Sequence, residues 1–191
     1  INTAKNEQTE TWFKGLDRIY NNFVYDFLYP NPASVLAFIE NHDTDRFLGE
    51  GNNLPMLKQA STLLLTTRRI PQLYYGTEVM MNGVKSKSDG YVRKDFPGGW
   101  TGDATNALTP AGRTKIQNEC YDFYKTILNW RKGNDVIAKG SMVQFMVQNG
   151  VYAYARQYEG KTIFVMLNGT DAETTVPLKF YKEILKNSKQ G

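Results

Sequence analysis

The sequence has 191 residues, of which 41% are hydrophobic and 22% are charged, and its formal net charge is +4. A chain of this size and composition can bury one core, or one core with a small appended module. Because no apolar stretch approaches the roughly 20 residues that cross a bilayer, a membrane span is excluded.

The charged residues and the single cysteine exclude further classes. Lys and Arg are scattered among acidic residues, which predicts a solvated surface and no nucleic-acid binding. Cys120 has no second cysteine to pair with, and one Cys with one His cannot supply a four-ligand zinc site. The first residue is Ile1 and no signal-type segment follows it, but this absence says little, because we expect the chain to be a piece of a longer one.

The first elements expected are a helix and a strand. Residues 7–28 carry apolar side chains at helical spacing, and Pro30 stops the pattern. Residues 34–39 then form a nearly continuous apolar run, which is typical of a strand covered on both faces in a parallel sheet. A polar cluster follows at once in residues 40–46.

A second helix and strand complete a βα unit. Asn53 can cap the helix, and Pro55 is acceptable in its first turn. Residues 70–75 supply the next strand, which Gly76 ends at a turn. Strand, helix and strand in this order predict two parallel strands joined by a helix.

A long polar segment separates this unit from a third helix. Residues 82–108 are rich in Gly, Asp, Lys and Thr, and loops of this length are often functional. Thr109 and Pro110 have the pattern of an N-cap and first turn, and the third helix is expected to close near Gly133.

The pattern changes to short β stretches after Gly140. Four strands are predicted at residues 141–147, 151–158, 161–167 and 174–178, with hairpin signals between them. We therefore expect two domains, at residues 1–139 and 140–191. The last segment is too polar and short to close a sandwich convincingly.

The chemically informative residues follow the first strand. Asn41, His42, Asp43 and Arg46 lie where βα barrels assemble their active sites. Asp43 can hold sugar hydroxyls, His42 can donate to the same sugar, and Arg46 can pair with Asp43 and keep it ionised. The alternative is a polar loop in which Asp43 only caps a helix.

Three segments carry a resemblance to a known family. Residues 38–47 (FIENHDTDRF) resemble the fourth conserved region of the α-amylase family of glycoside hydrolases, and residues 70–78 (IPQLYYGTE) resemble its last barrel strand. Residues 93–100 (RKDFPGGW) resemble a loop of neopullulanase and cyclomaltodextrinase-like members, especially bacterial starch-utilisation enzymes. The resemblance runs over nearly the whole chain.

The resemblance implies a fold and a set of roles. The fold would be α/β followed by all-β: the last two βα units of a (β/α)8 TIM barrel, then an antiparallel β-sandwich. Asp43 corresponds to the aspartate that stabilises the transition state, His42 to a sugar-binding histidine and Arg46 to the arginine near that aspartate. The other candidates are structural positions at Tyr75 and Glu78, and Trp100, which either stacks on a glucose ring or anchors its loop.

The implied activity is retaining hydrolysis of α-1,4-linked glucans such as starch, maltooligosaccharides, pullulan or cyclodextrins. Such hydrolysis needs a nucleophile and an acid about 5 Å apart, and the family carries both on barrel strands that this chain lacks. The remainder of the barrel would be a necessary partner, and without it the chain is expected to be inactive and to aggregate or form a homodimer. The alternative is a non-catalytic carbohydrate-binding or interaction module.

The remaining expectations concern cofactor, modification and location. The chemistry requires no cofactor. Calcium is common in the family, but Asp89, Asp95 and Asp103 match no calcium loop by spacing. Residues 168–170 (NGT) fit a glycosylation acceptor, although a hairpin turn is the favoured interpretation. A periplasmic or otherwise exported location is expected from the resemblance alone.

Overall fold

The computed structural model describes residues 15–49 and 51–185, and these residues form two compact units. A βα unit contains residues 36–65 and 70–133, and a sheet unit contains residues 15–35, 66–69 and 134–185. The predicted domains, residues 1–139 and 140–191, stay a prediction. In the part of the chain described, no helix is long and apolar enough to cross a membrane.

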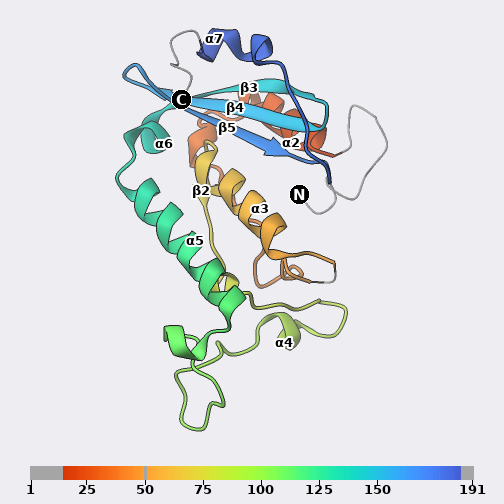
Figure 1. Ribbon diagram of the computed structural model, residues 1–191, viewed down its shortest axis with the longest axis vertical. Coiled ribbons are helices and arrows are strands. Elements are labelled where there is room, and N and C mark those ends of the chain that lie inside the picture. The colour runs from red at the N-terminus through yellow and green to blue at the C-terminus, as the bar shows by residue number, and fades with distance from the viewer. Residues whose placement is uncertain (1–14, 50, 186–191) are drawn as a thin grey trace. The chain divides into compact units, whose positions relative to one another are not determined.

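The βα unit contains the expected pair of parallel strands. Strand β1 (Leu36–Ala37) pairs with β2 (Ile70–Pro71) in parallel, and helix α3 (Leu54–Thr66) connects them (Figure 1). Asn53 caps this helix as predicted, since its Oδ1 accepts the Met56 N–H at 3.1 Å. Both strands are shorter than the sequence predicts.

The strands leave apolar side chains uncovered. Leu36 is 52% exposed, Phe38 43% and Ile70 48%, which is what we expect of part of a barrel whose neighbouring strands are not present. The reason is that, among the residues described, β1 and β2 form a two-stranded sheet in which each pairs only with the other. Their apolar side chains and outer edges are open to a further partner.

We expect the 191-residue chain, expressed alone, to self-associate through these strands, because open edges and contiguous apolar side chains favour pairing. Light scattering after size exclusion should show dimers or larger species, and Ile70→Lys should shift them toward monomer. Leu128→Lys, at an exposed position of the third helix, is the matched control and should change nothing. A monodisperse wild-type monomer would contradict this expectation.

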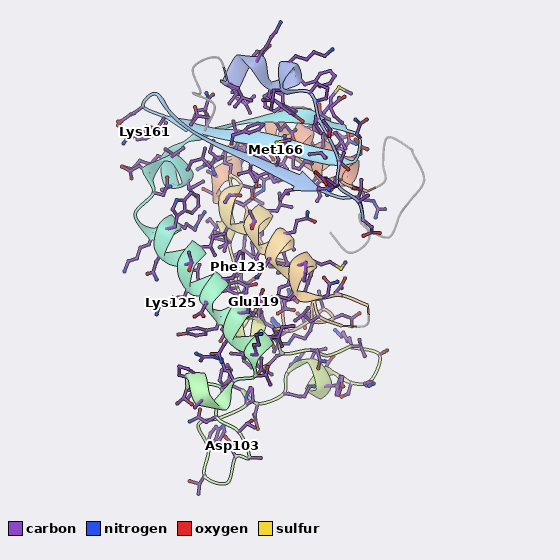
Figure 2. All side chains as sticks on the ribbon, in the orientation of Figure 1. Asp103, Glu119, Phe123, Lys125, Lys161 and Met166 are labelled. Carbon is purple, nitrogen blue, oxygen red and sulfur yellow. The ribbon has the colours of Figure 1, made fainter. Side chains whose placement is uncertain are left out.

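The third helix begins later than predicted. Thr109 and Pro110 start only a 3₁₀ turn, η4 (Pro110–Gly112), whereas α5 runs over Lys115–Lys132. Thr114 caps α5 through a capping box with Gln117, which the sequence prediction overlooked. Helix α5 lies beside α3, and Lys58 of α3 bonds Glu119 at 2.6 Å near Phe123 (Figure 2).

The segment between β2 and α5 is mostly irregular, as predicted for residues 82–108. A 3₁₀ turn, η3 (Thr77–Val79), follows Gly76, whose φ of 80° is readily adopted only by glycine. One short helix, α4 (Asp89–Val92), interrupts the loop. Figure 2 shows Asp103 on the part of this loop at the bottom of the view. Ser88 caps α4 by accepting the Tyr91 N–H.

The sheet unit begins with a helix shorter than predicted. Helix α2 (Asp17–Val24) continues into the 3₁₀ helix η1 (Tyr25–Leu28), and η2 (Pro32–Ser34) follows. The predicted residues 7–14 lie outside the described part of the chain. Helix α2 packs on strand β3 (Ser141–Gln148), where the Gln144 side chain donates to the Tyr20 carbonyl at 3.2 Å.

Three of the four predicted C-terminal strands are confirmed. Strands β3, β4 (Val151–Tyr158) and β5 (Lys161–Asn168) form an antiparallel sheet with β4 in the centre. Both hairpins turn where expected, with positive φ at Asn149 and Gly150 and at Glu159 and Gly160. Two consecutive positive φ angles match the right-handed twist of the flanking strands.

The predicted fourth strand and the sandwich are wrong for the described residues. Residues 174–177 are irregular, and Pro177 cannot donate to a ladder. A 3₁₀ helix, η5 (Leu178–Tyr181), and α7 (Lys182–Leu185) follow instead. The ring of Tyr181 packs 5.0 Å from Phe145 and 5.1 Å from Phe164 between ring centroids, and thereby covers the face that a second sheet would occupy.

Two buried polar clusters hold the sheet unit together. Arg156 of β4 is 2% exposed and donates to the carbonyl groups of Thr66, Ile137 and Gly140. Within the sheet unit, these bonds join β4 to Thr66 and to the short helix α6 (Asp135–Lys139). In the second cluster, Asp26 pairs with Arg68 and Arg69.

Candidate active site

The loop after β1 is folded by its own polar side chains. Asn41 Oδ1 accepts the Asp43 N–H at 2.9 Å, and Thr44 Oγ1 accepts the Asn41 N–H at 3.1 Å. Such Asx-type bonds replace backbone turns and need no helix. The side chains of His42 and Asp43 consequently stand in solvent, with exposed fractions of 58% and 59%. Because Asn53 caps the next helix, the interpretation of Asp43 as a helix cap is wrong.

Asp43 is surrounded by hydrogen-bond donors. Its Oδ2 lies 3.1 Å from His42 Nε2, and its Oδ1 lies 3.1 Å from Nη2 of Arg93. Arg93 Nε also donates to the His42 carbonyl at 3.0 Å, and Lys85 Nζ donates to the Asp43 carbonyl at 3.0 Å. The result is an accessible carboxylate held in one orientation, which can accept hydrogen bonds from a polar ligand.

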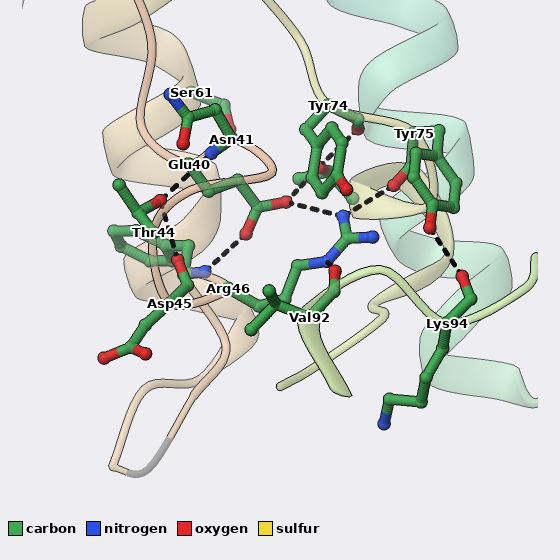
Figure 3. A network of polar contacts seen from close by, with 12 residues as sticks. Glu40, Asn41, Thr44, Asp45, Arg46, Ser61, Tyr74, Tyr75, Val92 and Lys94 are labelled. Carbon is green, nitrogen blue, oxygen red and sulfur yellow. Dashed lines mark hydrogen bonds and ion pairs between the residues drawn. The ribbon is translucent and has the colours of Figure 1, made fainter. Parts of the chain in front are cut away.

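The expected ion pair between Arg46 and Asp43 is wrong. Arg46 is 1% exposed, and its guanidinium group points inward to Glu40, with Nη1 3.4 Å from Oε1 (Figure 3). A buried cation requires a nearby counter-charge, and Glu40 is itself 1% exposed. Glu40 also accepts the Phe47 N–H and the Thr77 hydroxyl, so it links the end of β1 to the turn after β2. Arg93, from the long loop, takes the place beside Asp43.

The residues beside Asp43 that the sequence prediction missed lie on either side of α4, with Lys85 before the helix and Arg93 directly after it. Lys85, Asp89 and Arg93 are spaced four residues apart, and Asp89 pairs with Lys85 at 3.5 Å and with Arg93 at 3.2 Å. Alternating charges at this spacing are a recognisable signal of a salt-bridged helix face. The sequence therefore contained a signal for this cluster, although none for its place beside Asp43.

The remaining candidates lie after β2 and in the long loop. The Tyr75 hydroxyl donates to the Lys94 carbonyl at 2.5 Å, and Glu78 is half-buried. Trp100 is 71% exposed, and its backbone N–H donates to Asp103 Oδ2 at 2.8 Å. The exposed indole ring leaves a face open for stacking on a sugar.

The described residues do not fit a calcium site at the positions considered. Asp89 is engaged by two cations, and Asp103 accepts a backbone N–H. Within residues 15–49 and 51–185, no group of three or more His, Cys, Asp or Glu side chains could hold a metal ion. Calcium elsewhere in a longer protein stays a prediction.

Two other chemical candidates are structural. Burial raises the pKa of Cys120 to about 12, and its thiol donates to the Thr77 carbonyl at 3.6 Å, so it stays protonated at neutral pH. The Asn168 amide is engaged in a turn, because its Oδ1 accepts the Thr170 N–H at 2.9 Å and its Nδ2 donates to the Ala172 carbonyl at 2.8 Å. These bonds favour the turn over a glycosylation site.

Comparisons with known proteins agree with the resemblance in residues 38–47. Residues 142–191 match the Cyclo-malto-dextrinase C-terminal domain. An α-amylase of Niallia circulans is 29% identical over 185 residues, which is 93% of this chain and 31% of that protein. A cyclomaltodextrin glucanotransferase of Thermoanaerobacterium thermosulfurigenes is 30% identical over 187 residues, covering 94% and 23% of the two chains.

A solved structure shows the same likeness in three dimensions. The α-amylase from Geobacillus thermoleovorans, complexed with acarbose, matches with a TM-score of 0.64 at 25% identity. The match covers 88% of this chain and 34% of that one. This chain therefore spans less than a third of the length of the two curated relatives.

A βα unit that presents a carboxylate beyond the carboxyl end of its strand has the arrangement in which βα enzymes build active sites. The matches above are with α-amylases and a cyclomaltodextrin glucanotransferase. The chain belongs to the α-amylase family of glycoside hydrolases. A closer relation to neopullulanases, and the number of barrel strands in this chain, stay predictions.

Proposed function

We propose that this chain supplies one part of the active site of an enzyme that cleaves α-1,4-linked glucans with retention of configuration. The observation that carries the proposal is Asp43, an exposed carboxylate held between His42 and Arg93 beyond the end of β1. Membership of the α-amylase family supports the choice of an α-glucan over another polar ligand. The whole protein would contain further strands that complete the barrel.

In the proposed mechanism, Asp43 accepts hydrogen bonds from hydroxyls of the sugar at the bond being cleaved. As that bond breaks, the sugar ring gains positive charge and flattens toward an oxocarbenium ion. A fixed negative charge beside the ring is stabilising mainly in that state, so it accelerates the reaction and does not merely tighten binding. Its orientation is fixed beforehand by Arg93, which lowers the cost of reorganisation.

The other residues would assist in binding. His42, whose side chain is 58% exposed, would donate to a hydroxyl of the same sugar, and Trp100 would stack on a more distant glucose unit. The burial of Arg46 favours a supporting role over direct contact with a ligand. The nucleophile and the general acid would come from the remainder of the barrel, about 5 Å apart.

The test is an assay of the full-length protein on maltooligosaccharides, pullulan and cyclodextrins, with a β-linked glucan as control. We expect cleavage of the α-linked substrates, and NMR should show products that first form as the α-anomer. A melting shift with these sugars in the absence of any cleavage would support a non-catalytic carbohydrate-binding module. First formation of the β-anomer would refute retention.

A further inference from the structure

Arg46 contacts three separate segments of the βα unit with one buried side chain. Its Nε donates to the Val92 carbonyl at 3.0 Å, and its Nη1 donates to the Tyr75 carbonyl at 2.6 Å (Figure 3). The same Nη1 faces Glu40 at 3.4 Å. One planar group therefore ties the loop after β1 to the turn after β2 and to the end of α4.

The guanidinium group is held in a single plane. Its central carbon lies 3.9 Å from the ring centroid of Tyr74 and 4.7 Å from that of Tyr75, within the range of cation–π attraction. Its Nη2 is buried and has no hydrogen-bond partner, so the position of the guanidinium group does not satisfy all of its own donors. Two of its donated hydrogen bonds go to backbone carbonyl groups, those of Val92 and Tyr75, and therefore fix the position of the backbone there.

The bond to Val92 leads directly to Asp43. Val92 is fully buried and is the last residue of α4, and Arg93 follows it. Arg93 is the residue that donates both to Asp43 Oδ1 and to the His42 carbonyl. The Arg46 backbone N–H also donates to the Gly83 carbonyl at 2.9 Å, two residues before Lys85, which bonds the Asp43 carbonyl. Both cations beside Asp43 are therefore close in sequence to a backbone carbonyl that Arg46 bonds: Arg93 follows Val92, and Lys85 lies two residues after Gly83.

We propose that Arg46 is a positioning residue, which fixes the end of α4 so that Arg93 holds Asp43 in its reactive orientation. The inference rests on the proposed function of Asp43. Arg46 acts through Val92 and Arg93 and does not touch the substrate. Lysine cannot replace it, because one ammonium group cannot donate to the Val92 and Tyr75 carbonyls in one plane and also stack on Tyr74.

The first test is Arg46→Lys in the full-length protein. We expect kcat on a maltooligosaccharide to fall by about 10²-fold, since small displacements around a reacting centre cost this much. KM should change little, because the lost interaction is made in the transition state. The matched control is Arg156→Lys, at a 2% exposed arginine of the sheet unit that also bonds backbone carbonyls, and there kcat should be kept even if the melting temperature falls.

A double-mutant cycle separates positioning from general damage to the fold. In an Arg93→Ala background the link from Arg46 to Asp43 is already broken, so adding Arg46→Lys should lower kcat far less than it does in the wild type. Independent, multiplying losses in the two variants would overturn the proposal. An unchanged kcat in Arg46→Lys would overturn it as well.

A third measurement does not depend on activity. Hydrogen exchange of peptides that cover residues 41–45 and 91–95 should be faster in Arg46→Lys and unchanged in Arg156→Lys. If the wild-type protein cleaves no α-glucan, the proposed function fails, yet faster exchange would still show that Arg46 holds the Asp43 segment. Unchanged exchange in Arg46→Lys would overturn the positioning role whatever the activity.

Discussion

Asp43→Asn in the full-length protein is expected to lower kcat on maltooligosaccharides by about 10²–10³-fold, the typical cost of removing one electrostatic contact to the transition state. Asn has the same size, its single oxygen can still accept from Arg93, and the loop's own bonds at Asn41 and Thr44 are untouched, so the loop should stay folded. The loss is that of a negative charge beside the developing oxocarbenium ion. Initial rates over a range of substrate concentrations, with melting curves of both proteins, provide the measurement.

The matched control for this change is Asp45→Asn in the same loop. Asp45 is also exposed, but its Oδ1 accepts the Lys85 backbone N–H, a bond that an amide oxygen can make equally well. We expect the control variant to retain nearly the wild-type kcat. Near-normal turnover in Asp43→Asn, or an equal loss in Asp45→Asn, would remove Asp43 from the mechanism.

Sequence patterns predicted those parts of the fold that depend on neighbouring residues. The hairpin at Asn149 and Gly150 and the helix cap at Asn53 are confirmed, because each is decided by the conformational preference of one or two residues. The predicted strand at residues 174–178 is wrong for an equally local reason, since Pro177 has no N–H to donate to a strand ladder.

The partners of charged residues could not be predicted in this way. The three-residue spacing from Asp43 to Arg46 suggests a pair only if the segment is helical, and the structure shows a turn instead. Arg46 is drawn inward by Glu40 and by carbonyl groups 29 and 46 residues away. Arg93 reaches Asp43 across 50 residues, and no local pattern encodes that contact.

Asp26→Asn should destabilise the sheet unit by about 3 kcal/mol, because it leaves two guanidinium groups without their counter-charge. The side chains of Asp26 and Arg69 are only 8% and 6% exposed, and Arg68 Nη2 lies 2.6 Å from Asp26 Oδ2. Pulse labelling of the β4 peptide along a urea series reports the free energy of unfolding of this unit within the full-length protein. In the control Asp135→Asn, at an exposed pair with Lys139, the free energy should hardly change.

The same cluster predicts how stability depends on pH. Burial by itself raises the pKa of Asp26, but the hydrogen bonds and charges of Arg69 and Arg68 outweigh it and hold the pKa below its ordinary value. A carboxyl group with a lowered pKa in the folded state binds fewer protons there than in the unfolded chain. Its contribution is therefore complete above about pH 4, the ordinary value for Asp, and is lost as the pH falls through the lowered pKa. The difference in unfolding free energy between wild type and Asp26→Asn should accordingly shrink in acid, and a difference that is constant with pH would show that the charge of Asp26 is not what stabilises the unit.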